Sequence, residues 1–463
     1  MAALTGMMVW LLVGPVERAG LRLEQPNEGW NAGHALQAFS PALYPGPGAL
    51  FINNYPPLWF YLTGALARWF GDPILPARIV AFAAFFGVAA AIYALARNLR
   101  IDAGAAAIGA LGFVVTAAAF FRAYVGLDEP QMLAHALATA AAAAAMGSRR
   151  RRGIAVAALL TVLALLVKQI VVGLPIAVTL FLLLRRRHLL GAWIATGLAA
   201  AVIALAALLA AYGSSFVSNV ISPRYFSFER LGTSLAATLR VITPLVAFGV
   251  AAWGVRRRWD DAVLFAALAI AAAYAPIVVF GSVLGVSFNI GFDLAIAASL
   301  GLAVGWARTQ EALGRWGAPW RAVVAVALVA VPILDAPRDV RDPAALANAQ
   351  ATAVTSAALT TRIASLKGPV VCETLSICIW AGKPSAADLW KLHNERTLAF
   401  LDPAPMLARI RAGGYAGVVT MRPLIRPADD RDLPGLGAAL AAGYAPPVIY
   451  PGVGALYLPK ARP

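Results

Sequence analysis

The chain has 463 residues and a formal net charge of +16, yet only 13% of its residues are charged and 61% are hydrophobic. Soluble domains have about 25% charged and about 45–50% apolar residues, so this composition excludes an ordinary water-soluble globule. The basic residues form short Arg clusters between long apolar runs instead of one stripe. This pattern is typical of membrane topology and excludes a nucleic-acid partner.

Eleven apolar runs in the first three quarters of the chain are predicted to cross a membrane, because a bilayer core of about 30 Å needs roughly 20 apolar residues per helix. The first run has no basic leader and no cleavage site, so we expect a retained anchor and not a removed signal peptide. The runs lie near residues 2–16, 79–97, 103–121, 130–147, 153–168, 170–185, 189–212, 236–255, 262–281, 288–306 and 320–336.

Arg residues concentrate in alternate loops, and this sets the predicted orientation. Clusters such as Arg149 to Arg152 and Arg185 to Arg187 fall on one side, and short cytoplasmic loops carry such an excess. We therefore expect a multi-pass protein of the bacterial inner membrane with a cytoplasmic N-terminus. Residues 1–336 form the predicted all-α polytopic domain, and residues 337–463 lie on the periplasmic side.

The C-terminal segment, residues 337–463, is predicted to be a small periplasmic α/β domain. An Ala-rich helix near 343–366 is followed by short β-like runs that alternate with helical ones. Cys372 and Cys378 both fall in this segment, in a compartment that permits disulfides. A bridge between them and two buried free thiols both remain open. The β-like runs are 369–372, 415–421 and 455–458, and the helical ones 403–412 and 433–442.

The first outer loop, residues 17–78, is too long for a turn, and loops of this length usually carry function or structure of their own. It contains the sequence NEGWN at 27–31 and the sequence NNYPPLWFY at 53–61, which opens an amphipathic helix ending near Gly71-Asp72. Because Trp and Tyr prefer the membrane interface, we expect interfacial helices along the bilayer surface.

The segments at 27–31, 54–61 and 71–78 resemble the GT-C membrane glycosyltransferases. The resemblance is to bacterial relatives of protein O-mannosyltransferases and to the lipid A aminoarabinose transferase, which take sugar from a polyprenyl-phosphate carrier. It implies an inverting glycosyltransferase that uses a polyprenyl-phosphate sugar as donor. The implied partners are membrane lipid and a hydroxyl acceptor on the periplasmic face.

The resemblance also implies a catalytic base. In that family an acidic residue of the first outer loop serves as base, often within an Asp-Glu pair, and this chain has Asn27-Glu28. Glu28 is therefore the candidate that takes a proton from the acceptor. Family members often place Lys before the Pro-Pro pair to meet the carrier phosphate, where this chain has Tyr55. Glu28 could instead cap the helix that starts near Trp30 or pair with Arg22.

Cations are needed to stabilise charge on the departing phosphate. Lys168 interrupts an apolar stretch, and ionisable groups at membrane depth are functional hypotheses by default. A side chain that snorkels to the interface is the alternative for Lys168, and an interface anchor is the alternative for Arg224. The candidates are Arg78, Arg122, Lys168 and Arg224.

Further polar residues lie at the outer ends of two predicted spans. Related oligosaccharyltransferases use acids in the loop of Asp128 and Glu129 to bind a divalent metal, so these two residues are candidate metal ligands, with helix capping as the alternative. Asn289 and Asp293 are four residues apart and share a helix face. They could position the acceptor or the base, or form an interhelical hydrogen bond. No catalytic role is predicted for His34, His135, His188 or His393.

Two other functional classes remain open. A transporter or flippase for a lipid-linked sugar would show internal repeats and matching broken helices, and we find no convincing repeat. A non-catalytic relative that binds the carrier is suggested by Asn27 and Tyr55. The chain has no P-loop and no G-x-G-x-x-G motif after a predicted strand, so no nucleotide cofactor is predicted.

Overall fold

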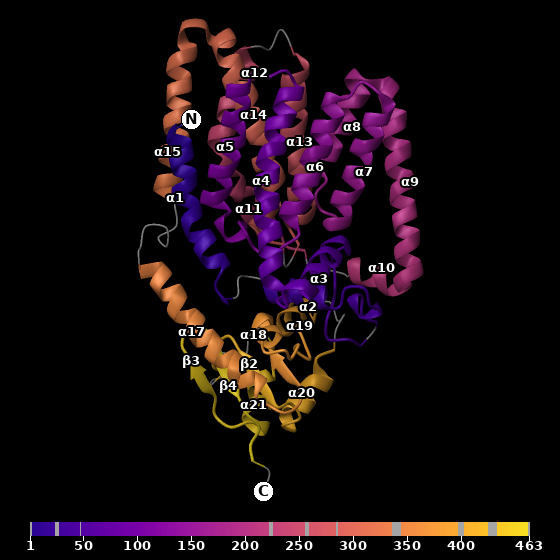
Figure 1. Ribbon diagram of the computed structural model, residues 1–463, viewed down its shortest axis with the longest axis vertical. Helices are drawn as coiled ribbons and strands as arrows, with labels where there is room; N and C mark the ends of the chain where they lie inside the picture. The colour runs from indigo at the N-terminus through magenta and orange to yellow at the C-terminus, as the bar shows by residue number, and fades with distance from the viewer. Residues whose placement is uncertain are drawn as a thin grey trace. The chain divides into compact units, whose positions relative to one another are not determined.

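A computed structural model describes residues 2–23, 27–46, 48–221, 226–254, 259–283, 286–335, 344–396, 402–424 and 433–461. The chain divides into two compact units (Figure 1). Unit 1 comprises Met1–Val16, Ile79–Ala207 and Phe226–Asp342. Unit 2 comprises Glu17–Arg78, Leu208–Tyr225 and Pro343–Pro463.

The helices that lie wholly or mainly in unit 1 account for every predicted apolar run. Helices α1 and α9 begin in unit 1 and end in unit 2, and α4 begins in unit 2. The helices are α1 (Ala2–Ala19), α4 (Ile74–Asn98), α5 (Ala103–Phe120), η2 (Arg122–Tyr124), α6 (Gln131–Gly147), α7 (Arg151–Val167), α8 (Gly173–Arg185), α9 (Arg187–Tyr212), α11 (Phe228–Ala236), η3 (Ala237–Val241), α12 (Ile242–Gly254), α13 (Asp261–Phe280), η4 (Phe288–Gly291), α14 (Phe292–Leu313), η5 (Gly314–Trp316) and α15 (Gly317–Asp335).

Six stretches of helix in the described part of the chain are long and apolar enough to cross a membrane, and two shorter apolar helices accompany them. The prediction of a mostly helical polytopic protein is thereby confirmed, with about six to eight apolar spans where eleven were predicted. The shorter helices are Leu4–Glu17 and Gly173–Arg185. Helices α6, α7 and α8 occupy three of the predicted runs and have 17, 17 and 13 residues, fewer than the roughly 20 that a full span needs.

Small residues allow close helix packing at the centre of unit 1. A Cβ added at Gly109 of α5 would lie 2.7 Å from the Ser299 carbonyl oxygen of α14, and one at Gly305 of α14 would lie 2.8 Å from the Ala247 carbonyl oxygen of α12. In lipid the hydrophobic effect does not drive helices together, so van der Waals contact at such close approaches stabilises their packing. Among the six candidate spans in the described residues, Phe288–Thr309, which includes most of α14, has the largest buried share, at 89%.

Unit 2 combines short helices with one four-stranded sheet. The sheet order is β1-β2-β4-β3, with β1 parallel to β2 and the other pairs antiparallel. The helices are α2 (Glu28–Leu36), η1 (Pro41–Leu43), α3 (Leu58–Phe70), α10 (Ser214–Val220), α17 (Ala344–Ala364), α18 (Leu375–Trp380), α19 (Leu389–Arg396), α20 (Ala404–Arg411) and α21 (Leu436–Gly443). The strands are β1 (Val370–Cys372), β2 (Gly417–Thr420), β3 (Val448–Tyr450) and β4 (Gly454–Tyr457).

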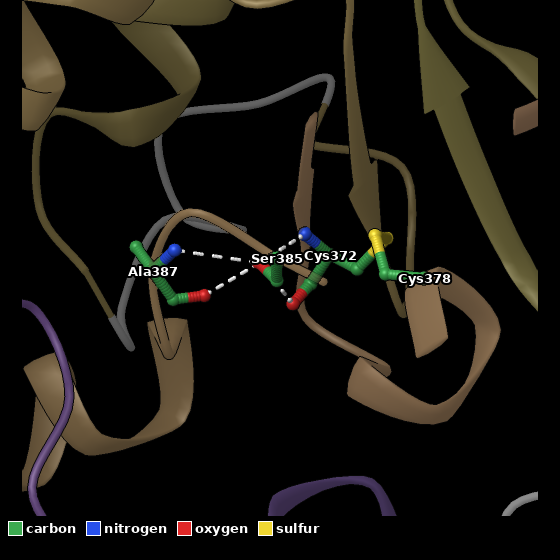
Figure 2. The surroundings of a disulfide bond; sticks show 4 residues. All are labelled: Cys372, Cys378, Ser385 and Ala387. Atoms are coloured by element: carbon green, nitrogen blue, oxygen red, sulfur yellow. Dashed lines mark hydrogen bonds between the residues drawn. A yellow bond between two sulfur atoms is a disulfide. The ribbon is translucent and has the colours of Figure 1, made fainter. Parts of the chain in front are cut away.

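The sheet confirms the predicted small C-terminal sheet but adds a strand. Strands β1 and β2 fall within predicted β-like runs and β4 overlaps the third one, whereas β3 was not predicted. Its three residues lie between prolines, which argue against a strand in sequence, and it occupies an edge of the sheet where prolines are tolerated. The two alternatives for the cysteines are also decided, because Cys372 and Cys378 form a disulfide (Figure 2).

The first outer loop packs with the C-terminal segment inside unit 2. Ile52 belongs to the same apolar cluster as strand residues of the sheet, and the Asp388 amide donates to the Leu50 carbonyl at 3.1 Å. The amide of Asn53 donates to Asn219 Oδ1 at 2.9 Å, which ties in α10. From the sequence, this loop was predicted to belong with residues 1–336. The predicted boundary at residue 336 lies outside the described residues.

Candidate functional site

Glu28 is the first residue of α2 and is completely buried. Asn27 precedes it with φ 68°, in the left-handed region, which Asn tolerates better than most residues. The amide group of Asn31 donates to the Asn27 carbonyl at 3.2 Å and holds this turn. Asn27 makes no side-chain cap, so the helix start is fixed by backbone and by Glu28 rather than by a capping side chain.

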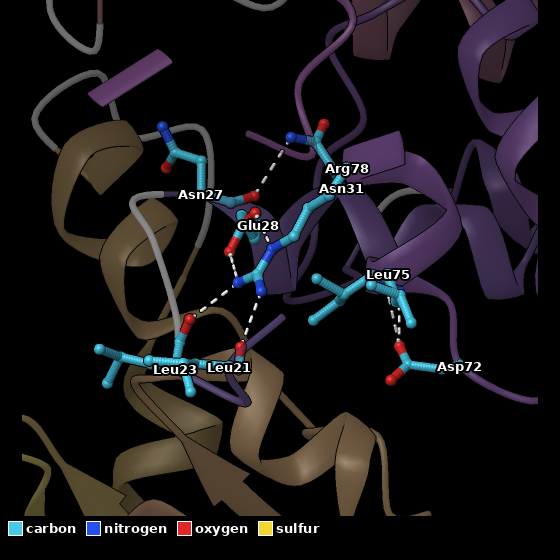
Figure 3. Close-up of polar contacts among 9 residues, drawn as sticks. Leu21, Leu23, Asn27, Glu28, Asn31, Asp72, Leu75 and Arg78 are labelled. Atoms are coloured by element: carbon cyan, nitrogen blue, oxygen red, sulfur yellow. Dashed lines mark hydrogen bonds and ion pairs between the residues drawn. The ribbon is translucent and has the colours of Figure 1, made fainter. Parts of the chain in front are cut away.

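Both carboxylate oxygens of Glu28 contact the guanidinium of Arg78 (Figure 3). Arg78 Nε donates to Oε1 at 2.8 Å and Nη2 donates to Oε2 at 2.5 Å. Nη1 and Nη2 also donate at 2.8 Å to the carbonyls of Leu21 and Leu23. Such a two-pronged pair fixes geometry as well as charge. The predicted partner Arg22 is exposed, so the buried cation beside Glu28 is Arg78.

The position of Arg78 follows from the start of α4. Asp72 Oδ1 accepts from the Ile74 amide at 2.8 Å and caps this helix, so Arg78 is one turn into α4 and points back toward α2 (Figure 3).

An aromatic cluster adjoins Glu28 on α2. The ring of Trp30 lies 4.5 Å from that of His34 and 5.1 Å from that of Tyr55, centroid to centroid. Lys391 Nζ lies 5.3 Å from the Trp30 ring centre, as in a cation–π contact. Burial, and then the Lys391 charge, lower the pKa of His34 to about 3, so this imidazole is neutral. The sequence analysis gave no catalytic role to His34 and did not single out Lys391.

A second polar cluster lies in unit 1 and is built around Lys168. Its side chain is 2% exposed and its ammonium donates to Glu129 Oε1 and, at 3.0 Å, to Gln131 Oε1. Asn289 Nδ2 also donates to Gln131 Oε1, at 2.7 Å, while Gln131 Nε2 donates to the Asn289 carbonyl at 2.8 Å. The elements that supply these groups are the start of α6, the residue after α7, and η4.

Two further side chains extend this cluster toward α14. Gln131 Nε2 lies 3.2 Å from His135 Nε2, and His135 Nδ1 lies 3.9 Å from Asp293 Oδ1. Asp293 Oδ1 is also next to Gly173, where an added Cβ would be 2.9 Å away. Gly173 begins α8, and a helix N-terminus favours a nearby carboxylate. Sequence reasoning found Asn289 and Asp293 but gave no catalytic role to His135 and did not single out Gln131, although these two are four residues apart on α6.

The predicted metal site finds no support in the donor set. The Glu129 carboxylate contacts Lys168 and accepts from the Gln131 amide at 2.8 Å, so for Glu129 the capping alternative is the observed arrangement. Asp128 is buried beside it. Among the described residues, no group of three or more His, Cys, Asp or Glu side chains could hold a metal ion.

The structure thus groups the predicted residues into two sets. Glu28, Arg78 and the ring of Tyr55 lie in unit 2, with Asn27 exposed at the start of α2. Lys168, Glu129, Asn289 and Asp293 lie together in unit 1. Arg122 is buried in η2 of unit 1. Arg224 lies outside the described residues.

Comparison with known proteins identifies the fold. Residues 54–211 match a family model described as dolichyl-phosphate-mannose-protein mannosyltransferase. No curated protein matches the chain. ArnT from Cupriavidus metallidurans bound to undecaprenyl phosphate has a similar structure, with a TM-score of 0.64 at 16% identity, covering 99% of this chain and 98% of that one. Its apo state gives a TM-score of 0.61 at 14% identity, covering 99% and 98%.

A third solved structure is more distant. The Archaeoglobus fulgidus oligosaccharyltransferase tethered with an acceptor peptide gives a TM-score of 0.52 at 12% identity, covering 99% of this chain and 74% of that one. At such identities the likeness shows the fold alone. The family match over residues 54–211 supports the resemblance to GT-C membrane glycosyltransferases that the first outer loop indicated, and the solved structures share the fold of this chain.

Proposed function

We propose that the chain is a lipid-carrier-dependent glycosyltransferase that moves a sugar from a polyprenyl phosphate to a hydroxyl acceptor. Residues 54–211 match the family model described as dolichyl-phosphate-mannose-protein mannosyltransferase. The family match carries this proposal. The similar ArnT structure is bound to undecaprenyl phosphate, which supports a carrier of that class here. The active site faces the periplasm, and all eleven apolar runs, including α6, α7 and α15, cross the membrane.

In the proposed reaction, Glu28 takes the proton of the acceptor hydroxyl as its oxygen attacks C1 of the sugar. The C1–O bond to the carrier breaks on the opposite face, and polyprenyl phosphate leaves with the bonding electron pair. The anomeric configuration is therefore inverted. The Arg78 fork holds the Glu28 carboxylate in one orientation, and such preorganisation is what a positioned base requires.

Lys168 is the favoured cation for the departing phosphate. Its ammonium is buried and contacts the carboxylate of Glu129, and a fixed cation of this kind stabilises negative charge that grows on a nearby phosphate. Arg122 and Arg224 are proposed to add positive charge, and Tyr55 and Asn27 to line the carrier site. Asn289 and Asp293 are proposed to orient substrate groups. No step of this reaction uses a metal.

The test replaces Glu28 with Gln in full-length protein reconstituted in membranes with a labelled polyprenyl-phosphate sugar. We expect transfer to fall about 10²- to 10⁴-fold, as for loss of a general base. Glu229→Gln is the matched control, because Glu229 is exposed in the first turn of α11. Unchanged turnover in Glu28→Gln would remove Glu28 from the mechanism.

The same assay separates the other classes. A flippase would move the labelled carrier across the bilayer and leave its sugar attached. A carrier-binding relative would retain the labelled carrier without consuming it. Release of polyprenyl phosphate together with a labelled acceptor is the outcome that the glycosyltransferase proposal requires.

A further inference from the structure

Helix α18 is anchored at both ends to the sheet of unit 2. The disulfide links Cys378 of α18 to Cys372 at the end of β1 (Figure 2). The Cys372 amide donates to Ser385 Oγ at 2.9 Å, and the Ser385 hydroxyl donates to the Ala387 carbonyl at 2.7 Å (Figure 2). The Glu373 amide donates to the Val419 carbonyl of β2 at 2.9 Å. The short helix is therefore linked to β1 by a covalent bond, and hydrogen bonds hold the segments that precede and follow it.

Helix α2 rests directly on the backbone of α18. A Cβ added at Gly29 would collide with the Ser376 backbone nitrogen and lie 2.8 Å from the Leu375 carbonyl carbon. No residue larger than glycine fits there unless the helices separate. Since Gly29 immediately follows Glu28, the position of α18 determines how far the first turn of α2 can move.

One side chain of α18 contacts the helices that carry both members of the ion pair. Ile379, the residue after Cys378, packs with Ala32 of α2 and Ile74 of α4 in one apolar cluster. Ala32 is four residues after Glu28 and Ile74 is four residues before Arg78, so each lies on the same helix face as its charged neighbour. Ile379 therefore sits between the two turns whose separation sets the Glu28 and Arg78 geometry.

We infer that α18 is a positioning element for the Glu28 and Arg78 pair, and that the Cys372 and Cys378 disulfide holds it in that position. A dithiol reductant that gives two electrons and two protons converts the bridge to two thiols and is itself oxidised. Helix α18 then loses its covalent link to β1, and Ile379 no longer fixes α2 against the start of α4. The activity arm of this inference rests on the proposed function.

Helix α18 provides its own matched control. Ile377 lies on the other side of this helix and packs with Leu359 and Val419 in the core of the sheet domain. Ile377→Ala and Ile379→Ala remove the same atoms from one helix, but only the second removes the contact with α2 and α4. Ile379→Val keeps most of that contact.

The experiment measures hydrogen exchange of the peptide covering residues 28–36 together with kcat and KM for the labelled donor, in full-length protein. We expect Ile379→Ala to speed exchange about tenfold and lower kcat about tenfold with KM nearly unchanged, because misplaced catalytic groups lose rate. Ile379→Val should restore both values. Ile377→Ala should leave both near those of the unmodified protein once corrected for the folded fraction.

The redox arm compares the unmodified protein with Cys372→Ser/Cys378→Ser, each with and without the dithiol. In the unmodified protein, reduction should speed exchange and lower kcat as Ile379→Ala does. The double cysteine variant should show both changes without the dithiol, and adding the dithiol should change neither value further. In the Glu28→Gln background, Ile379→Ala should lower kcat no further.

Three results would overturn the inference: equal effects of Ile377→Ala and Ile379→Ala, exchange in residues 28–36 that neither Ile379→Ala nor reduction accelerates, or faster exchange with kcat unchanged. If the unmodified protein transfers no sugar, the proposed function fails. The exchange measurements alone then decide whether α18 holds the pair.

Discussion

Arg78→Ala tests how much the buried ion pair contributes to unit 2. The change removes both bonds to Glu28 and both bonds to the Leu21 and Leu23 carbonyls. It leaves the Glu28 carboxylate, which has no exposed surface, without its cation. The dominant effect is therefore the uncompensated negative charge and not the lost attraction.

The magnitude follows from this burial. Removing one partner of a buried pair destabilises a protein by about 3–5 kcal/mol, whereas an exposed pair contributes about 0–1 kcal/mol. The side chains of Glu28 and Arg78 are 0% and 3% exposed, so the larger range applies. Since each 1.4 kcal/mol is about tenfold in an equilibrium constant, the equilibrium constant for local opening of α2 should increase by about 10²- to 4 × 10³-fold.

Hydrogen exchange of residues 28–36 in detergent-solubilised protein measures this opening, because exchange reports the local opening free energy of a segment. Arg68→Ala is the control, since Arg68 is exposed on α3 and lies over the Phe39 ring at 5.0 Å. Its loss should change stability by about 0.5–1 kcal/mol. Glu28→Gln/Arg78→Met should recover part of the protection by removing both charges.

A change below about 1 kcal/mol in Arg78→Ala would show that Glu28 is solvated in the molecule, and the reasoning from burial would be refuted. Equal acceleration in Arg68→Ala would have the same meaning, because the control lacks a buried partner. Recovery in the double variant would locate the penalty in the orphaned carboxylate.

Three further outcomes are expected. Lys168→Met should lower the melting temperature, because it leaves the Glu129 carboxylate uncompensated at a cost of about 3–5 kcal/mol in stability. Lys168→Met/Glu129→Gln should regain stability but not sugar transfer. Sugar transfer by the double variant would contradict the phosphate role of Lys168. The free energy of unfolding of unit 2 should fall by about 1.4 kcal/mol per pH unit as the pH drops below about 6.5. The reason is that His34 binds a proton in the unfolded chain but not in the folded one, where its pKa is lowered to about 3. Denaturation at a series of pH values should show this slope in the unmodified protein and not in His34→Gln. Gly109→Val should destabilise α5 against α14 by about 1–3 kcal/mol, as seen by thermal unfolding, whereas Gly249→Val points into open space and should have little effect.

Local patterns in the sequence were sufficient for the helical architecture. A membrane span is a run of apolar residues in one stretch of chain, and a described helix overlaps every predicted run. The β-like runs at 369–372, 415–421 and 455–458 could be recognised for the same reason. Strand β3 could not, because its pairing with β4 overrides the local signal of the flanking prolines.

Contacts between distant residues had no such local signature. Glu28 meets Arg78 across 50 positions of the chain, and Lys168 meets Glu129 across 39. Which cation neutralises which carboxylate depends on how helices pack, and every outer-end Arg or Lys satisfies the same sequence criterion. The sequence suggested Arg22 as a partner for Glu28 and Arg78 as a cation for the carrier phosphate, whereas packing places Arg78 against Glu28.

By itself the sequence determined that this chain resides in lipid, how its apolar runs are spaced and which glycosyltransferase family its first outer loop resembles, since composition and motifs are properties of contiguous residues. Only the tertiary structure decided that the loop packs with the C-terminal sheet, that Cys372 and Cys378 are bonded, and that each buried carboxylate has its own cation. These three features depend on burial, because a buried charge without a partner strongly destabilises the folded protein. Burial arises only when distant segments of the chain pack together.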